Sequence, residues 1–178
     1  MDREGHDACQ FANTVDGWII EGAAVFENDG QAANLSYRLV CDQKWASMRA
    51  TVAGWIGERD FRLDIERDGD NGWCIDGKKS KFLYGLKDID LGFTPASNTN
   101  AIKRLGLCKG DEAESVAVWL DTSDWTVKPL RQSYRRTQNN AFDYASPQHD
   151  YRATITVDDF GAVTEYPALW VMLYHDKV

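Results

Sequence analysis

Apolar and polar side chains alternate with a period of two along much of this chain. The clearest runs are residues 35–41, 61–66 and 151–157, in which every second side chain is apolar. Successive side chains of a β-strand point to opposite faces, so this alternation predicts strands with one apolar and one polar face. Helical periodicity is confined to residues 98–107. The chain is therefore expected to be an all-β protein with at most one short helix.

Pairs of Asp-Gly and Asn-Gly separate these runs. Such pairs adopt the positive φ angles of two-residue hairpin turns, and they occur at Asp16-Gly17, Asp29-Gly30, Asp68-Gly69, Asn71-Gly72 and Asp76-Gly77. About a dozen segments have strand length: 18–26, 34–43, 47–57, 60–68, 72–76, 82–86, 88–93, 115–121, 130–137, 151–158, 162–166 and 169–174. A flat sheet of that many antiparallel strands would expose its edges and a wide apolar face. The sheet must therefore curl, roll or pair with itself.

The composition supports one globular domain over residues 1–178. The chain is 43% hydrophobic and 12% aromatic, which is enough to build a core and too apolar for a disordered chain. No composition shift or linker divides it. Residues 1–15 and the polar stretch at 138–149 are expected to be its mobile segments.

The charge balance argues against nucleic acid and anionic membranes as partners, because the formal net charge is -8. One exception is Lys128–Arg136, which holds four basic residues and no acid. No apolar run reaches the roughly 18 to 20 residues of a membrane helix, so stable membrane insertion is not expected. The first seven residues are charged and lead into no apolar core. We therefore expect no secretory signal and a cytoplasmic location.

The sequence contains no convincing motif for a metal, a cofactor or a nucleophile. The four cysteines include no C-x-x-C pair, and the three histidines are scattered, so neither a metal site nor a redox site is expected. Residues 72–79 fit G-x-x-x-x-G-K, but they read as a strand and a hairpin turn and not as a phosphate loop before a helix. Asp88 and Asp90 would place two carboxylates about 7 Å apart on one strand face. That pair suits acid–base chemistry or a solvated surface.

The segment 86–105 combines a strand, a Pro-fixed turn, a polar cluster and a basic helical end. Its run Asp88-Ile-Asp-Leu, Thr94-Pro95, Asn98-Thr99, Ile102 and Arg104-Leu105 resembles the signature of a glycolipid-binding family of bacterial proteins, formerly a domain of unknown function. Further matching positions, in family order, are Gly72-Trp73, Asp76-Gly77, Gln132-x-Tyr134, Tyr144-x-Ser146, Asp158, Gly161, Val163, Tyr166-Pro167 and Leu169-Trp170. The chain departs from the pattern at Ala101 and Lys103, where Pro and Arg were expected.

The resemblance implies a single antiparallel sheet rolled into a spiral β-roll or half-barrel, similar to the bacterial lipoprotein-localisation carriers. It implies a glycolipid or other amphiphile held on the concave face, with no catalytic residues and no cofactor. For the lining of that face we choose Trp18, Tyr37, Trp55, Trp73, Tyr134, Tyr151 and Trp170. For a polar rim we choose Asp90, Asn98, Thr99, Arg104, Gln132 and Arg136.

Two other functions compete with this hypothesis. One is a hydrolase or isomerase that acts on a small sugar-like molecule through Asp88, Asp90 and Arg104. The other is a ligand-free interaction scaffold whose interior is packed solid. An interior cavity separates the carrier from the scaffold, and a polar cleft with a raised carboxylate pKa would favour the enzyme.

Overall fold

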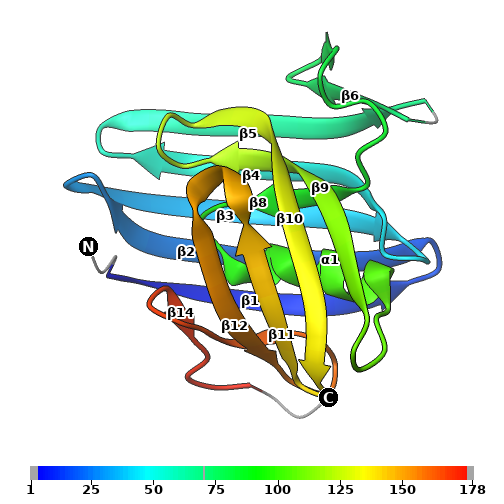
Figure 1. Cartoon of the computed structure of the whole chain (residues 1–178). Helices are drawn as coiled ribbons and strands as arrows, with labels where there is room; N and C mark the ends of the chain where they lie inside the picture. Colours follow the sequence, from blue (N-terminus) through cyan, green and yellow to red (C-terminus); the bar gives the residue numbers. More distant parts are fainter. Residues whose placement is uncertain (1–3, 70, 176–178) are drawn as a thin grey trace.

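The computed structural model describes residues 4–69 and 71–175, and its strands form two sheets of seven (Figure 1). The N-terminal sheet contains β1 (Gly5–Thr14), β2 (Gly17–Asn28), β3 (Gln31–Asp42), β4 (Ser47–Ile56), β5 (Arg59–Asp68), β6 (Gly72–Ile75) and β7 (Lys78–Ser80). The C-terminal sheet contains β8 (Asp88–Leu91), β9 (Glu112–Asp121), β10 (Thr126–Gln138), β11 (Ala141–Ser146), β12 (Tyr151–Val157), β13 (Val163–Tyr166) and β14 (Trp170–Val171). The all-β prediction is confirmed.

The N-terminal sheet is a meander in which each strand pairs antiparallel with the next. Two of its turns have the predicted chemistry. At Asp29-Gly30 the φ angles are 52° and 77°, and at Asp76-Gly77 they are 49° and 74°. These left-handed angles match the twist of the flanking strands, so tight turns join β2 to β3 and β6 to β7.

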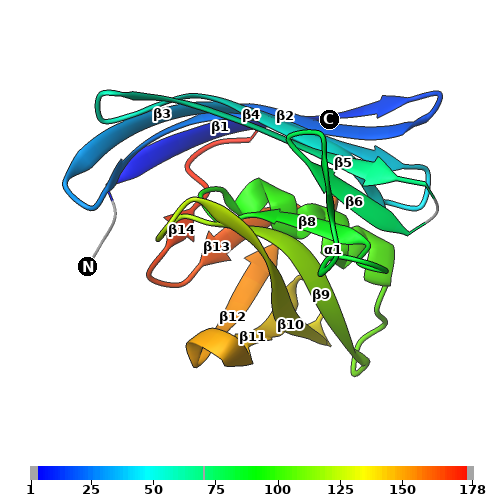
Figure 2. The same ribbon diagram turned by 90° about the horizontal axis from the view of Figure 1, so that it is seen from above.

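The C-terminal sheet begins with a parallel pair. Strand β8 runs parallel to β9 because the chain between them forms the 3₁₀ helix η1 (Pro95–Ser97) and the helix α1 (Asn98–Leu105) before it returns. Gly106, with φ 56°, ends α1 in the left-handed conformation. Both views place α1 between the N-terminal sheet and strands β10–β12 (Figures 1 and 2). Among the described residues, no helix is long and apolar enough to cross a bilayer.

The prediction of one continuous rolled sheet is wrong, because the strands divide into two sheets. The chain leaves the first sheet after β7, and segment 82–86, expected to be a strand, forms none. Its Leu83 is buried in the core, while Phe82 is 84% exposed. Alternation determines which face a side chain takes but not which strands pair, so the sequence could not distinguish a rolled sheet from two packed ones.

Paired strands lie within the two segments that we expect to be mobile, residues 1–15 and 138–149, of which residues 1–3 lie outside the described part of the chain. β1 pairs with β2 from Gly5 to Thr14, and β11 pairs with both β10 and β12. β1 is an edge strand whose side chains are all at least partly exposed. Because both faces of this edge strand are accessible, its apolar and polar side chains need not alternate strictly. Its sequence therefore resembles that of a loop.

The main core lies between the sheets, where the curved N-terminal sheet arches over β8 and β9 (Figure 2). Phe93 stacks on Phe26 with ring centroids 5.8 Å apart, and it meets Tyr37 edge-on at 5.7 Å. Trp73 is 1% exposed and donates its indole N–H to the carbonyl oxygen of Leu86. Side chains from β8 and β9 therefore fill the face of the first sheet on which a ligand was expected.

Candidate functional site: a tyrosine-rich pocket on the C-terminal sheet

A pocket of about 250 Å³ lies where the C-terminal sheet meets the β8–α1 connection. All seven strands of the C-terminal sheet contribute to its wall, together with η1, α1 and a short 3₁₀ helix after β11, so the fold of the whole C-terminal half positions it. The lining residues are Asp90, Gly92, Thr94, Pro95, Asn98, Trp119, Leu130, Tyr144, Ser146, His149, Tyr151, Tyr166, Leu169 and Trp170. The volume is slightly below the range of about 300–1,000 Å³ for drug-sized ligands, so the pocket fits a small group.

Three tyrosines form one wall of the pocket. The ring centroid of Tyr144 lies 5.7 Å from that of Tyr166 and 6.2 Å from that of Tyr151. Tyr151 and Tyr166 stack with centroids 5.8 Å apart and planes 5° from parallel. Burial raises the pKa of both Tyr144 and Tyr166. These phenols therefore stay neutral, and the wall offers aromatic faces together with hydroxyl groups.

Trp119 and His149 also line the pocket. Their rings meet edge-on with centroids 4.9 Å apart. Gly92 makes room for the indole, because a Cβ at this position would lie 2.8 Å from Trp119 Nε1 and 2.6 Å from the carbonyl oxygen of Leu120. Only glycine lets the indole lie this close to the end of β8.

Asp90 supplies a carboxylate to this aromatic pocket. Its Oδ2 accepts a hydrogen bond of 2.6 Å from the Gln132 side-chain amide, which also donates to the Tyr144 hydroxyl at 3.0 Å. Burial raises the pKa of the Asp90 carboxyl to about 6; the hydrogen bond from Gln132 opposes the rise, and the charge of Asp88 adds to it. Asp90 is thus a half-buried acid in contact with a neutral donor.

Asp88, two residues earlier on the same strand, has the opposite environment. It is 1% exposed and accepts two hydrogen bonds of 2.6 Å from Arg104 of α1. Ser115 of β9 donates to the same carboxylate. A buried carboxylate with a bidentate arginine and a hydroxyl is fully partnered. This group therefore ties α1 to the sheet and leaves Asp90 as the acid that faces the pocket.

Two further polar side chains of the lining have unused capacity. The Ser146 hydroxyl is buried and has no hydrogen-bond partner within the described part of the chain. The Asn98 amide nitrogen donates to the Tyr134 hydroxyl at 3.2 Å, and its carbonyl oxygen remains as an acceptor. A buried hydroxyl without a partner is costly. A polar ligand in the pocket would supply one.

Local hydrogen bonds hold the Thr94-Pro95 edge of the pocket in place. Thr94 caps η1 by accepting from the Ala96 amide at 3.1 Å and donates to Asp7 of β1 at 2.8 Å. Ser97 accepts from the Leu91 amide at 3.0 Å. The edge is therefore anchored to both sheets, and the pocket is preorganised.

The side chains of the pocket can form hydrogen bonds to a ligand and stack against it. Across residues 4–69 and 71–175, no group of three or more His, Cys, Asp or Glu side chains is placed to hold a metal ion. Carboxylate, amide and hydroxyl groups suit the hydroxyls of a sugar, and aromatic faces suit its apolar C–H surface.

Comparison with models of protein families identifies the family of this chain. The model of the family described as "Putative glycolipid-binding" matches residues 1–171. The chain belongs to this family. It is also similar to a crystal structure of a DUF1089 family protein from Pseudomonas aeruginosa, with 27% sequence identity and a TM-score of 0.86. That similarity covers 96% of this chain and 92% of the other. No curated protein matches the chain.

The structure places the seven residues chosen as lining in four environments. Tyr151 and Trp170 line the pocket of this glycolipid-binding family member, and Tyr134 lies behind it, with its ring centroid 5.1 Å from that of Tyr144. The other four lie elsewhere: Trp18, Tyr37 and Trp73 pack in the core between the sheets, and Trp55 is 40% exposed on β4.

The six residues chosen as rim also separate. Asp90 and Asn98 line the pocket, and Gln132 holds Asp90 from behind. The remaining three lie outside the lining: Arg104 pairs with Asp88, Arg136 donates to the carbonyl oxygens of Leu107 and Asn139, and Thr99 is fully buried.

Sequence reasoning did not select several residues that line the pocket. Tyr144, Ser146 and Tyr166 stand in motifs through which the chain resembles the glycolipid-binding family, so that resemblance contained a signal for them. Trp119 and His149 carried no such signal. They come to the pocket through the parallel pairing of β8 with β9 and through η2 (Pro147–His149), and local patterns predict neither.

Proposed function

We propose that this pocket binds the head group of an amphiphile, in the first instance the sugar of a glycolipid, without chemical conversion. The observation that carries the proposal is a preformed aromatic pocket that contains the Asp90 carboxylate and the unpartnered Ser146 hydroxyl. Aromatic faces provide stacking surface, and the polar groups provide hydrogen bonds that orient a ligand. Membership of a family described as glycolipid-binding supports the same ligand class.

The pocket accommodates a head group more readily than a whole lipid. Its volume of about 250 Å³ equals the share of roughly eight water molecules in the liquid. Leu169 lines the pocket and is 50% exposed, and Val171 and Leu173 beyond it are 65% and 77% exposed. We infer that an acyl chain leaves the pocket across these side chains. Each methylene that they shield from water would contribute up to about 0.8 kcal/mol.

Among the residues chosen from the sequence, Tyr151, Trp170, Asp90 and Asn98 are the contacts that we propose, with Gln132 positioning Asp90. Side chains fill the concave face of the first sheet, where the sequence placed the ligand. We therefore propose that the ligand binds in the pocket on the second sheet. The preorganised wall supports binding without a large rearrangement.

A hydrolase or isomerase is the second candidate, and one observation favours it. The Asp90 carboxyl has its pKa raised to about 6, which suits a general acid or base near neutral pH. Against it, Asp88 is held by Arg104 and Ser115 and so offers no second free carboxylate. Conversion of a bound glycoside to new products would favour the enzyme.

The test is binding of octyl glucoside, measured by calorimetry below its micelle concentration and followed by product analysis. Octyl tetraethylene glycol has the same chain without the sugar and serves as the matched ligand. We expect octyl glucoside to bind more tightly. Tyr151→Ala should weaken it by about tenfold, because the stacking surface is lost.

Tyr84→Ala is the matched control, since this tyrosine is 71% exposed and lies outside the pocket lining. Its affinity should equal that of the unmodified protein. The proposal fails if neither ligand binds, or if Tyr151→Ala and Tyr84→Ala bind octyl glucoside equally. Native mass spectrometry of protein purified from cells provides an independent measurement of any lipid that copurifies.

A further inference from the structure

We infer that the pocket selects a head group that carries a positive charge, an amino or quaternary ammonium group, with Asp90 as its counter-ion. This inference rests on the proposed function and names the ligand class of the same pocket. It depends on two features of the lining: an acid without a cationic partner, and aromatic faces around it.

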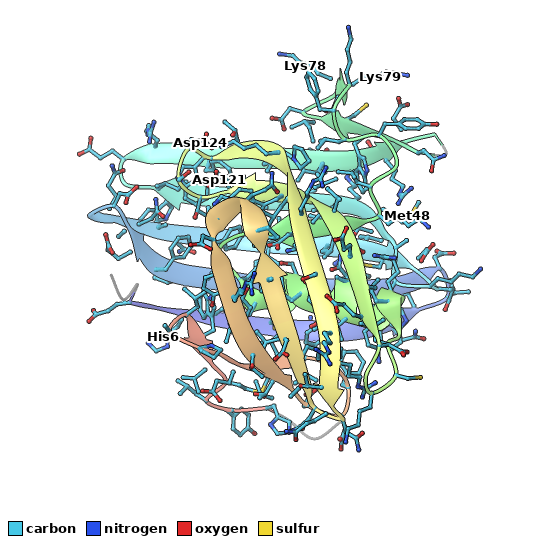
Figure 3. The ribbon with its side chains drawn as sticks, viewed as in Figure 1. His6, Met48, Lys78, Lys79, Asp121 and Asp124 are labelled. Carbon is cyan, nitrogen blue, oxygen red and sulfur yellow. The ribbon has the colours of Figure 1, made fainter. Side chains whose placement is uncertain are left out.

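Asp90 has no arginine or lysine partner in the pocket, since neither residue type occurs among the described residues that line it. Lys128, two residues before Leu130 on β10, forms ion pairs with Asp121 at 2.8 Å and Asp124 at 2.6 Å. Figure 3 labels these two acids at the end of β9 and in the turn that follows. A desolvated carboxylate is normally paired with a cation, so a cationic ligand would complete the site.

Asp88 and Asp90 differ in their partners. Both acids lie on β8, and the structure pairs Asp88 with Arg104 while it gives Asp90 the neutral Gln132 amide. The same strand therefore presents one acid whose cation comes from the protein and one whose charge remains unbalanced. A neutral sugar would leave that imbalance in place.

The aromatic faces favour a cation for a second reason. Tyr144, Tyr151, Tyr166, Trp119 and Trp170 line the pocket together with Asp90. The face of an aromatic ring attracts a cation within about 6 Å of its centroid, and aromatic cages of this kind recognise quaternary ammonium groups. An anionic head group would meet Asp90 and these electron-rich faces without an arginine or lysine among the described lining residues to bind it.

Protonation of Asp90 should weaken cation binding, because the neutral acid is no counter-ion. The groups that face Asp90 are Asp88 of β8, which is paired with Arg104, and three tyrosines: Tyr134 of β10, Tyr144 of β11 and Tyr166 of β13. Burial raises the pKa of these three tyrosines, so they stay neutral. His149 lines the same pocket, so the pH dependence is measured in the His149→Gln variant, in which Asp90 is the acid that remains in the described lining.

The experiment compares choline with 3,3-dimethylbutan-1-ol, which has the same shape but carries no charge. Calorimetry or chemical-shift titration measures both affinities. We expect choline to bind about tenfold more tightly. Its affinity should fall by about tenfold from about pH 7.5 to about pH 5, as a group with a pKa of about 6 gains its proton. The alcohol should show no such change.

Asp90→Asn should abolish the preference for choline, and Asp159→Asn should keep it, because Asp159 is exposed and lies outside the lining. If Asp90→Asn does not fold, the pH dependence of choline binding in the His149→Gln variant decides alone. Equal binding of choline and the alcohol overturns the inference. So does binding of octyl glucoside without any binding of choline, which leaves the proposed function intact. If none of these ligands binds, the proposed function fails as well.

Discussion

Two acids on the short strand β8 have different environments because their hydrogen-bond partners differ. Asp88 and Asp90 share strand β8, and their spacing in the sequence predicted that both carboxylates lie on one face of it. Arg104 reaches Asp88 from α1 with two hydrogen bonds of 2.6 Å, whereas Asp90 receives a neutral amide. The distinction arises from tertiary structure, so no pattern along β8 could have shown which acid faces a pocket.

Asp90 should reduce the stability of the folded protein above neutral pH. Folding raises the pKa of this carboxyl from its ordinary 3.8 to about 6, so the folded state binds the proton more strongly than the unfolded state. The resulting stabilisation is complete below about pH 4 and is lost as the pH rises through about 6. The Asp90→Asn side chain cannot ionise. The free energy of unfolding of this variant should therefore be about 2 kcal/mol higher than that of the unmodified protein at pH 8 and equal to it near pH 4.

Urea unfolding at both pH values measures this difference. Asp159→Asn removes the same charge from an exposed position and should show no comparable gain at high pH. A constant difference between Asp90→Asn and the unmodified protein across this range would contradict the assignment. A substitution that stabilises the protein at a binding residue is a common sign of a site that sacrifices stability for function.

At the scale of elements, a buried amide of α1 links the helix to both sheets. The Asn100 side-chain amide donates to Ser47 of β4 and to the carbonyl oxygen of Ile89 on β8, and Ser47 accepts from the Ile89 amide at 3.0 Å. Asn100 also accepts from the Ala101 amide at 2.7 Å. One residue thus joins the helix to a strand of each sheet.

Asn100→Leu should cost about 1–3 kcal/mol of unfolding free energy. Leucine has a similar volume but leaves the carbonyl oxygen of Ile89 and the Ser47 hydroxyl without this donor in a dry interior. Urea unfolding measures the loss. Asn13→Leu on the exposed edge strand β1 is the matched control and should change the free energy by less than about 0.5 kcal/mol. Equal effects of the two substitutions would show that the buried amide contributes nothing.

The elements themselves were largely predictable from the sequence, and the failures have physical causes. Strands such as β3 and β5 bury one face and expose the other, so alternation revealed them. β11 lies inside a polar stretch with Pro147 at its end, and it is a strand because β10 and β12 pair with it on both sides. Pairing of this kind comes from neighbours distant in sequence, which local propensity does not represent.

At the scale of the whole molecule, the sheets meet through a few large side chains. Phe93 follows β8, is 1% exposed, and contacts both Phe26 and Tyr37 of the first sheet. The same connection continues into Thr94 and Pro95 at the pocket edge. The packing of the two sheets therefore supports the pocket, and we propose that residues 1–178 unfold as one cooperative domain.

Phe93→Ala tests that cooperativity, because it removes a contact between the sheets rather than within one. A buried phenylalanine replaced by alanine costs about 3–5 kcal/mol, and in one cooperative unit the loss lowers the stability of both sheets together. Circular dichroism and tryptophan fluorescence should then report the same urea midpoint, shifted equally. Phe82→Ala, at a side chain that is 84% exposed, should leave that midpoint almost unchanged. Two separate transitions in Phe93→Ala, with one sheet melting while the other persists, would show that the sheets are independent domains, and the pocket would then have to be stable with the C-terminal sheet alone.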